Sequence, residues 1–444
     1  MRPFFFRSKL VQASMMLAFF SLVAKLTGLF RDRILASHFG ASRVLDIYYS
    51  AFNIPDLIFN LFILGAVSSA FIPVFIEHYR QDRDGAWRIA QNFLTIGTLM
   101  VIVIGLVAGI FAGPIARAIA PGFSETDLAR LIPLLRLMLL SPVLFSISAI
   151  MGSVLQSLER FMAYAIAPIL YNLGIIAGAL WIVPWAGQYG WSESMGLGLG
   201  VILGALLHLT LQLAAAMRAG FRFKFVFNIR DPGLRKIFRL MIPRTLGIGA
   251  YSLDTVAMSA IASTLGAGKI AVFSLANNLQ FVPISVLGIS VATAVFPQLS
   301  SHGSAQEYQE FRTKLSRALW RTGLLVGAIA LVAIFLRQQL VSILFSAGAF
   351  ASTNVQATAN VLGIFMLGVV AQSLLPIISR AFYALQDTKT PAIVTIISVL
   401  INIALALWFT YGFDMDVYGL ALAFAIAGNL NFLVLYVLFR TRYF

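Results

Sequence analysis

The residues best suited to chemistry are cations at the end of the first apolar run. Lys25 lies within that run, and Arg31, Asp32 and Arg33 follow where it ends. Ionisable groups inside membrane spans are costly and are functional candidates by default. A guanidinium can hold a phosphate through two parallel hydrogen bonds, so a cavity with several cations suits an anionic headgroup. We predict that Lys25 and Arg31 face a polar cavity, and that Arg33 reaches the membrane surface.

Two carboxylates in later apolar runs form a second group of candidates. Asp46 either pairs with Arg43 or a first-span cation, or contacts the substrate, and the pairing is slightly favoured. Asp254 lies deep in an apolar run beside hydroxyl residues. Oxygen ligands of this kind suit Na⁺ or a proton relay, and a structural salt bridge to Arg244 is the equal alternative.

Several kinds of chemistry are excluded by the residues present. The chain has no cysteine and four histidines that are far apart in sequence, which argues against a metal site. No Walker motif, catalytic carboxylate pair or Ser/His/Asp arrangement is found. We therefore predict a transporter without enzyme activity, cofactor or metal, driven by Na⁺ or proton coupling or by the membrane potential.

The composition indicates an integral membrane protein. Of 444 residues, 60% are hydrophobic and only 11% charged, and the mean hydropathy is +0.89. A soluble domain is about 25% charged, so a water-soluble enzyme is excluded. The formal net charge of +15 lies between apolar runs, which favours an anionic phospholipid membrane over nucleic acid as the partner.

A membrane-spanning helix needs about 20 apolar residues, and twelve segments meet this rule. The sequence thus predicts an all-α protein with spans at 11–30, 45–77, 89–115, 127–156, 163–184, 196–217, 240–263, 270–299, 319–345, 355–384, 391–411 and 417–439. Long spans either tilt or break at Pro55, Pro142, Pro283 or Pro376.

The loop charges predict the orientation. If the N-terminus is inside, the outer loops carry only Arg43, Arg117, Lys269 and Arg337 as cations. The inner segments carry most of the rest, and segment 218–239 is the most basic. Because cytoplasmic loops are rich in Lys and Arg, both termini are predicted to be cytoplasmic.

The sequence predicts two six-helix lobes, at 1–217 and 240–444, around a central cavity. Gln156 precedes Asn172 by the same spacing that separates Gln386 from Asn402, which indicates a duplication. Two halves that enter the membrane in the same direction are a known transporter plan. The joining segment, 218–239, alternates Phe with Arg or Lys, and it is either an amphipathic interfacial segment or a plain cytoplasmic linker.

Several motifs resemble those of the MurJ (MviN) family of the multidrug/oligosaccharidyl-lipid/polysaccharide exporter superfamily. They include Gly28-Leu-Phe-Arg-Asp32, Ala36-Ser-His-Phe-Gly40, Ala51-Phe-Asn-Ile-Pro-Asp56, Gly65-Ala-Val-Ser-Ser-Ala-Phe-Ile-Pro73 and Phe382-Tyr-Ala-Leu-Gln-Asp-Thr-Lys-Thr-Pro391. The resemblance implies a flippase of the bacterial plasma membrane. Such a flippase moves lipid II, the undecaprenyl-pyrophosphate-linked peptidoglycan precursor, from the inner to the outer leaflet by alternating access.

The resemblance also implies a set of substrate-binding positions. The family's first-span arginines fall on Lys25 and Arg31, and the Asp of its second span falls on Asp46. Two further arginine positions fall on Asn60 and Asn278, where this chain has amides. Other readings stay open: a flippase for another polyprenyl-linked oligosaccharide, or an ion-coupled exporter of small molecules. No protein partner is indicated.

Overall fold

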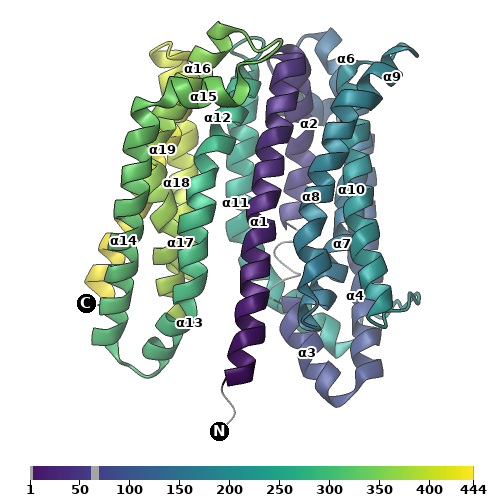
Figure 1. Cartoon of the computed structure of the whole chain (residues 1–444), viewed down its shortest axis with the longest axis vertical. Helices are drawn as coiled ribbons and strands as arrows, with labels where there is room; N and C mark the ends of the chain where they lie inside the picture. Colours follow the sequence, from purple (N-terminus) through teal and green to yellow (C-terminus); the bar gives the residue numbers. More distant parts are fainter. Residues whose placement is uncertain (1–3, 62–69, 444) are drawn as a thin grey trace. The chain divides into compact units, whose positions relative to one another are not determined.

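The structure is a computed structural model that describes the backbone of residues 4–61 and 70–443. Side chains are described for residues 15–61, 70–239, 241 and 249–443. Within these ranges the chain is all-helical, as the sequence predicted (Figure 1). It divides into two compact units, residues 1–38 with 47–252 and residues 39–46 with 253–444. The predicted lobe boundaries at 217 and 240 stay a prediction.

The first unit is built from helices that pack as antiparallel neighbours. Its elements are α1 (Phe4–Phe39), α2 (Arg43–Phe59), α3 (Ile72–Gln81), α4 (Arg83–Ile110), α5 (Ala112–Ile119), α6 (Glu125–Met138), α7 (Leu140–Ser157), α8 (Phe161–Ala177), η3 (Gly178–Ile182), α9 (Val183–Gly187), α10 (Glu193–Arg218) and the first part of α11 (Pro232–Ser263). The turn after α1 and the start of α2 belong to the second unit.

The second unit repeats this plan. It holds the rest of α11, then α12 (Lys269–Pro283), η4 (Ile284–Ile289), α13 (Ser290–Ser304), α14 (Tyr308–Phe335), α15 (Arg337–Phe345), α16 (Ser352–Met366), α17 (Val369–Ala384), α18 (Lys389–Leu407), η5 (Trp408–Gly412) and α19 (Asp416–Tyr443). Its core around Phe311, Phe382 and Phe439 joins α14, α17 and α19.

Eight helical segments in the described part of the chain are long and apolar enough to cross a membrane. The number becomes nine when α16 and α17, bent by 44° at their junction, are taken as one span. This bend lies at Leu367 and Gly368 rather than at the predicted Pro376, because Gly368 lets the chain approach α19 closely: an added Cβ would lie 2.8 Å from the Cα of Ala425. The number of twelve spans stays a prediction.

The duplication is visible in the helix irregularities. The π-helical segment η3 begins at Gly178, six residues after Asn172, and η5 begins at Trp408, six residues after Asn402. A π-turn is rare and needs a specific local cause, so its recurrence at matching positions supports the common origin of the two halves.

The segment between the halves has no regular structure before α11 begins at Pro232. It is held against α4 by amide side chains. Gln91 donates to the carbonyl of Arg222 (2.7 Å), and Asn92 both donates to and accepts from the backbone of Asn228 (2.8 and 2.9 Å). Phe223, Phe225 and Phe227 remain exposed beside the basic residues.

Glycines let α10 come within backbone contact of η3 and α9, which continue α8. A Cβ at Gly200 would lie 2.6 Å from the Cα of Gly178, and one at Gly196 would lie 2.8 Å from the Cα of Val183. Small residues at such crossings allow the close packing that drives helix association in lipid. The stripe formed by Gly196, Gly200 and Gly204 is therefore a packing face.

We predict that Gly200→Ala destabilises the protein, because the new methyl group meets backbone that cannot move aside. The expected cost is about 1–3 kcal/mol, measured as a lower thermal unfolding midpoint in detergent. Gly113→Ala is the matched control, because nothing lies within 4 Å of that position. An equal midpoint for both variants would contradict the packing argument.

Candidate anion-binding site on the first helix

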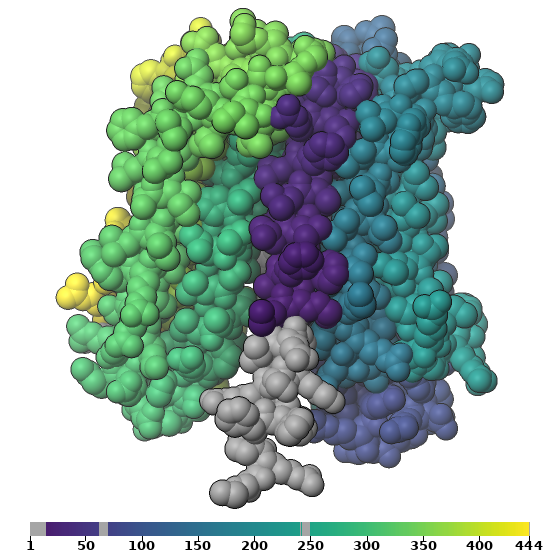
Figure 2. Space-filling model, viewed as in Figure 1, coloured from purple at the N-terminus to yellow at the C-terminus, as the bar shows by residue number. Residues whose placement is uncertain are grey.

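Lys25 and Arg31 are carried by one unbroken helix, α1. The exposed side chains of this helix include Phe19, Leu22 and Leu26. Its surface is visible, in purple, in the space-filling view (Figure 2). Lys25 and Arg31 are only partly exposed. Two cations are therefore carried by one helix among several exposed apolar side chains.

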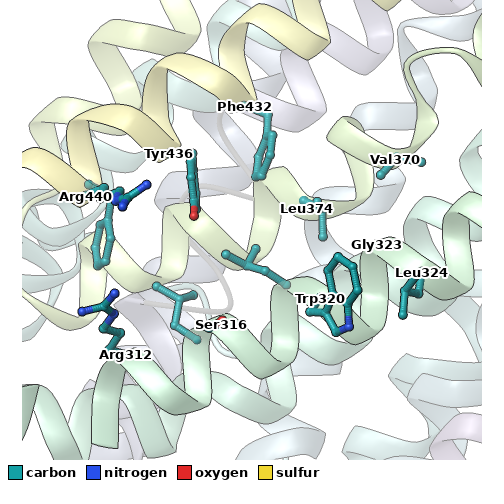
Figure 3. A pocket seen from close by; sticks show the side chains of 13 residues that line it. Arg312, Ser316, Trp320, Gly323, Leu324, Val370, Leu374, Phe432, Tyr436 and Arg440 are labelled. Carbon is teal, nitrogen blue, oxygen red and sulfur yellow. The ribbon is translucent and has the colours of Figure 1, made fainter. Parts of the chain in front are cut away.

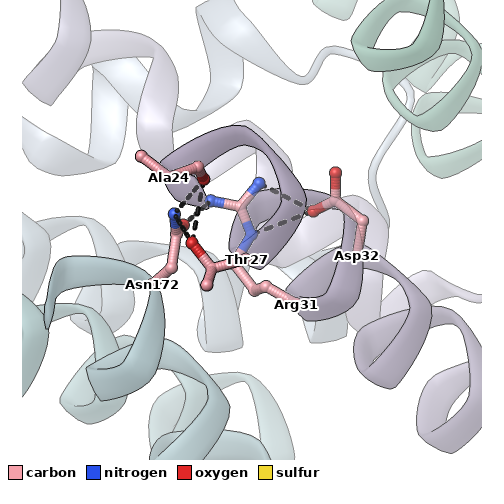
Figure 4. Close-up of polar contacts among 5 residues, drawn as sticks. All are labelled: Ala24, Thr27, Arg31, Asp32 and Asn172. Atoms are coloured by element: carbon pink, nitrogen blue, oxygen red, sulfur yellow. Dashed lines mark hydrogen bonds and ion pairs between the residues drawn. The ribbon is translucent and has the colours of Figure 1, made fainter. Parts of the chain in front are cut away.

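Arg31 is held in place by a network of polar contacts (Figure 4). Its Nε and Nη2 donate to Oδ1 of Asp32 at 2.9 and 2.7 Å, and its Nη1 donates to Oδ1 of Asn172 on α8 at 3.0 Å. The amide of Asn172 donates to the carbonyl of Ala24 at 3.2 Å and to the hydroxyl of Thr27 at 3.4 Å. Asp32 is almost fully buried. The guanidinium is thus oriented by groups from two helices.

The network leaves part of the guanidinium available. A guanidinium has five N–H donors, and the described residues accept from three of those on Arg31. The side chain is 21% exposed. The two remaining N–H groups of this oriented guanidinium can donate to a pair of phosphate oxygens. The contact with Asp32 offsets the positive charge of Arg31, but it also fixes the orientation of the guanidinium.

Aromatic hydroxyls surround this cluster. Tyr48 and Tyr49 lie close enough to Arg31 to interact with it electrostatically, and Tyr171 interacts with both Arg31 and Asp56. The hydroxyl of Tyr49 is buried and has no hydrogen-bond partner among the described residues. Asp56 on α2 has an exposed side chain. The region around α1 and α2 therefore offers donors and acceptors for a polar ligand.

Asn60, the remaining predicted site residue of the first unit, directly follows α2. Asn60 donates to the hydroxyl of Ser252 at 3.1 Å. It is half-buried and lies where the helix takes π geometry. Its amide can bind a neutral polar group of a substrate, whereas the arginine implied there by the resemblance would bind an anion.

Asp46 has a structural task in the second unit. Its Oδ2 accepts from the backbone N–H of Gly268 and its Oδ1 accepts from that of Ala271 at 3.0 Å. These groups lie at the N-terminus of α12, where the helix has unsatisfied donors. Arg43 is 3.6 Å away, so the predicted pairing is present. Asp46 therefore anchors the α1–α2 turn to α12.

Asp254 and Asn278 also lie in the second unit. Asn402 on α18 donates to Oδ1 of Asp254 at 2.8 Å, and both residues are buried. The Oδ1 of Asn402 is buried without a partner among the described residues. A carboxylate beside a free amide oxygen is a set of hard oxygen donors. Asn278 is half-buried on α12. The side chain of Arg244 lies outside the described residues.

No cluster of three or more His, Cys, Asp or Glu residues that could hold a metal occurs among the described residues.

Comparison with known proteins decides the family. The family model described as lipid II flippase MurJ matches residues 35–443. The chain belongs to this family. A probable lipid II flippase MurJ of Haemophilus influenzae is 30% identical over 448 residues, covering 94% of this chain and 83% of the relative.

Solved structures agree on the fold. The inward closed conformation of lipid II flippase MurJ aligns with a TM-score of 0.81 at 24% identity, covering 96% of this chain and 87% of that one. An inward-facing multidrug-resistance MATE transporter of the MOP superfamily aligns with a TM-score of 0.77 at 16% identity, covering 94% of both chains. The two-lobe MOP fold predicted from the resemblance is confirmed.

Two residues of the Arg31 network were absent from the predicted site. Asp32, which follows the apolar run beside Arg31, bonds the Arg31 guanidinium. Asn172 was noted only as part of the internal repeat. That repeat was the available signal, because an amide recurring at the same position in two apolar spans has a polar partner inside the membrane.

We predict that Asp46→Ala destabilises the protein by about 1–3 kcal/mol, because two buried N–H groups of α12 lose their acceptor. The measurement is the thermal unfolding midpoint in detergent. Asp84→Ala removes the same charge at an exposed position and should leave the midpoint unchanged. A midpoint for Asp46→Ala equal to wild type would refute the anchoring role.

Proposed function

We propose that this protein is a lipid II flippase that moves the undecaprenyl-pyrophosphate-linked precursor from the inner to the outer leaflet of the plasma membrane. The observation that carries the proposal is a pre-oriented guanidinium at Arg31, with two donors left, in a chain of the lipid II flippase family. It acts as a transporter, not as an enzyme.

The pyrophosphate is proposed to bind at Lys25 and Arg31. The Arg31 guanidinium gives direction through its planar donors, while the Lys25 ammonium adds a flexible point charge. Asn60 and Asn278 are proposed to contact the sugar and peptide portions, for which neutral amides suffice. Asp46 is proposed to position the α1–α2 turn through its hydrogen bonds to the start of α12. The lipid tail stays in the bilayer throughout.

The proposed cycle uses alternating access of the two lobes, 1–217 and 240–444, joined by the amphipathic linker 218–239. The loop charges support cytoplasmic termini, because the basic linker and the basic ends of α14 and α19 would then meet the anionic inner leaflet. The headgroup would enter from that side.

Energy is proposed to come from Na⁺ or protons at Asp254, or from the membrane potential. The buried pair of Asp254 and Asn402 supports an ion site, since the unpartnered Oδ1 of Asn402 lies in the same pair as the carboxylate. An ion or proton that neutralises this carboxylate would remove the cost of a buried charge.

We predict that Lys25→Ala and Arg31→Ala each lower transport by about ten- to a hundredfold, the value of one or more charge-assisted hydrogen bonds. The measurement is complementation of a bacterium depleted of its own lipid II flippase, with an assay of lipid II accessible on the outer leaflet. Arg31→Lys keeps the charge but loses the planar donors, so its transport should fall between alanine and wild type.

Arg130→Ala is the matched control for charge, because this exposed arginine has no polar partner among the described residues. Transport is compared at equal amounts of folded protein in the membrane, because Arg31→Ala also removes the partner of the buried Asp32. Wild-type transport in both Lys25→Ala and Arg31→Ala would sink the proposed site. Failure of the wild-type protein to expose lipid II would instead favour another polyprenyl-linked glycan as the substrate.

A separate prediction concerns Asp254. In proteoliposomes, Asp254→Asn should abolish the dependence of the transport rate on an imposed Na⁺ or proton gradient, because the amide cannot change its charge. Binding of lipid II to the purified variant should persist, since Lys25 and Arg31 are unchanged. Asp84→Asn is the control. If Asp254→Asn retains the full gradient dependence, the membrane potential becomes the proposed source of energy.

A further inference from the structure

The second unit contains an apolar pocket that the transport mechanism does not use. It has a volume of about 600 Å³ and lies between α14, α17 and α19 (Figure 3). Its floor consists of the buried side chains of Leu315, Leu319, Leu374 and Phe439. Pockets of 300–1,000 Å³ with an apolar lining and a few polar groups are typical ligand sites.

The polar groups of the pocket are gathered at one end. Arg312 and Arg440 lie together there, from the start of α14 and the end of α19, and Trp320 and Leu324 lie toward the other end (Figure 3). Ser316 follows Arg312 by one helical turn and shares its face. Arg440 makes no hydrogen bond or ion pair with any described residue, whereas nearby Arg442 bonds Thr390 at 2.8 Å.

The length of the pocket corresponds to one leaflet. Along α14 it extends from Arg312 to Leu324, which is about 18 Å at the helical rise of about 1.5 Å per residue. The hydrocarbon of one leaflet is about 15 Å thick. An acyl chain could therefore lie along the pocket with its headgroup phosphate beside the two arginines. Tyr436, one helical turn before Arg440, is of a type that favours the membrane interface.

We propose that this pocket binds one anionic phospholipid, such as phosphatidylglycerol, with its phosphate held by Arg312 and Arg440 and an acyl chain lying over Leu319 and Leu374. The two arginines favour an anionic headgroup over a neutral one. The apolar floor favours contact with an acyl chain. A polyprenyl chain is several times longer than the pocket, so the substrate lipid fits it poorly. The proposal is independent of the proposed transport function.

The test uses phosphatidylglycerol and phosphatidylcholine that carry the same photoreactive group on one acyl chain. The full-length protein is reconstituted in vesicles of neutral lipid with a trace of either probe, irradiated, and digested for mass spectrometry. We expect phosphatidylglycerol to label peptides of α14 and α19 at residues 315–324 and 432–440 in clear excess over phosphatidylcholine.

Charge removal separates this site from the general lipid surface. Arg312→Gln with Arg440→Gln should lower the labelling by phosphatidylglycerol about fivefold for each arginine, as expected for an interfacial cation. The double variant Arg317→Gln with Arg321→Gln is the matched control. It removes two exposed arginines from the same helix that do not line the pocket, and should label as wild type.

A steric variant tests the pocket without changing charge. A Cβ at Gly323 would lie 3.8 Å from Leu374, so Gly323→Leu fills the pocket and should reduce labelling. Gly327→Leu, one turn further along α14, meets nothing within 4 Å and is the control. Comparable unfolding midpoints of the four variants exclude misfolding as the cause.

Two results would overturn the proposal. Equal labelling by both probes, unaffected by the pocket variants, would show only the lipid shell that surrounds any membrane protein. Displacement of the label by undecaprenyl pyrophosphate at lower concentration than by unlabelled phosphatidylglycerol would assign the pocket to the substrate lipid. Specific labelling that the arginine and Gly323 variants abolish, and their controls keep, would establish the site.

Discussion

A buried asparagine ties the first helix of each half to a later helix of the same half, and the polar interior is arranged around these two bonds. Asn172 on α8 bonds the carbonyl of Ala24 on α1, and Asn402 on α18 bonds the carboxylate of Asp254 on α11; each pair is 148 residues apart in sequence. Burying a side-chain amide in hydrocarbon without a hydrogen-bond partner costs several kcal/mol of free energy. The two asparagines therefore fix helix positions that apolar packing alone would leave free to slide.

The two halves use this matched asparagine position differently. At the position matched by Ala24, the second half has Asp254, so its asparagine meets a carboxylate instead of a backbone carbonyl. Asn172, with only a carbonyl and a hydroxyl to donate to, still has its own oxygen available for Arg31. One amide thus orients a cation for an anionic ligand, and the other places a carboxylate in a buried setting suited to a small cation or proton.

The all-helical fold, the duplication and the importance of α1 could be predicted from the sequence, because apolar length, repeat spacing and charges within spans are local signals. The partners of those charges could not. Asp32 is adjacent to Arg31, and helical spacing alone argues that neighbouring residues do not face each other. They meet because the arginine side chain is long enough to turn back. The role of Asp46 at α12 could not be predicted from the sequence either, since its partners are backbone groups 222 and 225 residues away.

The α1–α2 turn shows how a local anchor shapes the larger organisation. Residues 39–46 pack with the second unit although the helices on either side belong to the first. The carboxylate of Asp46 provides the reason, because it satisfies two donors at the start of α12 that would otherwise be buried without partners. Arg31 lies on the helix that enters this turn, only eight residues before it. One helix thus carries the candidate anion-binding cation and leads directly into the turn that Asp46 anchors.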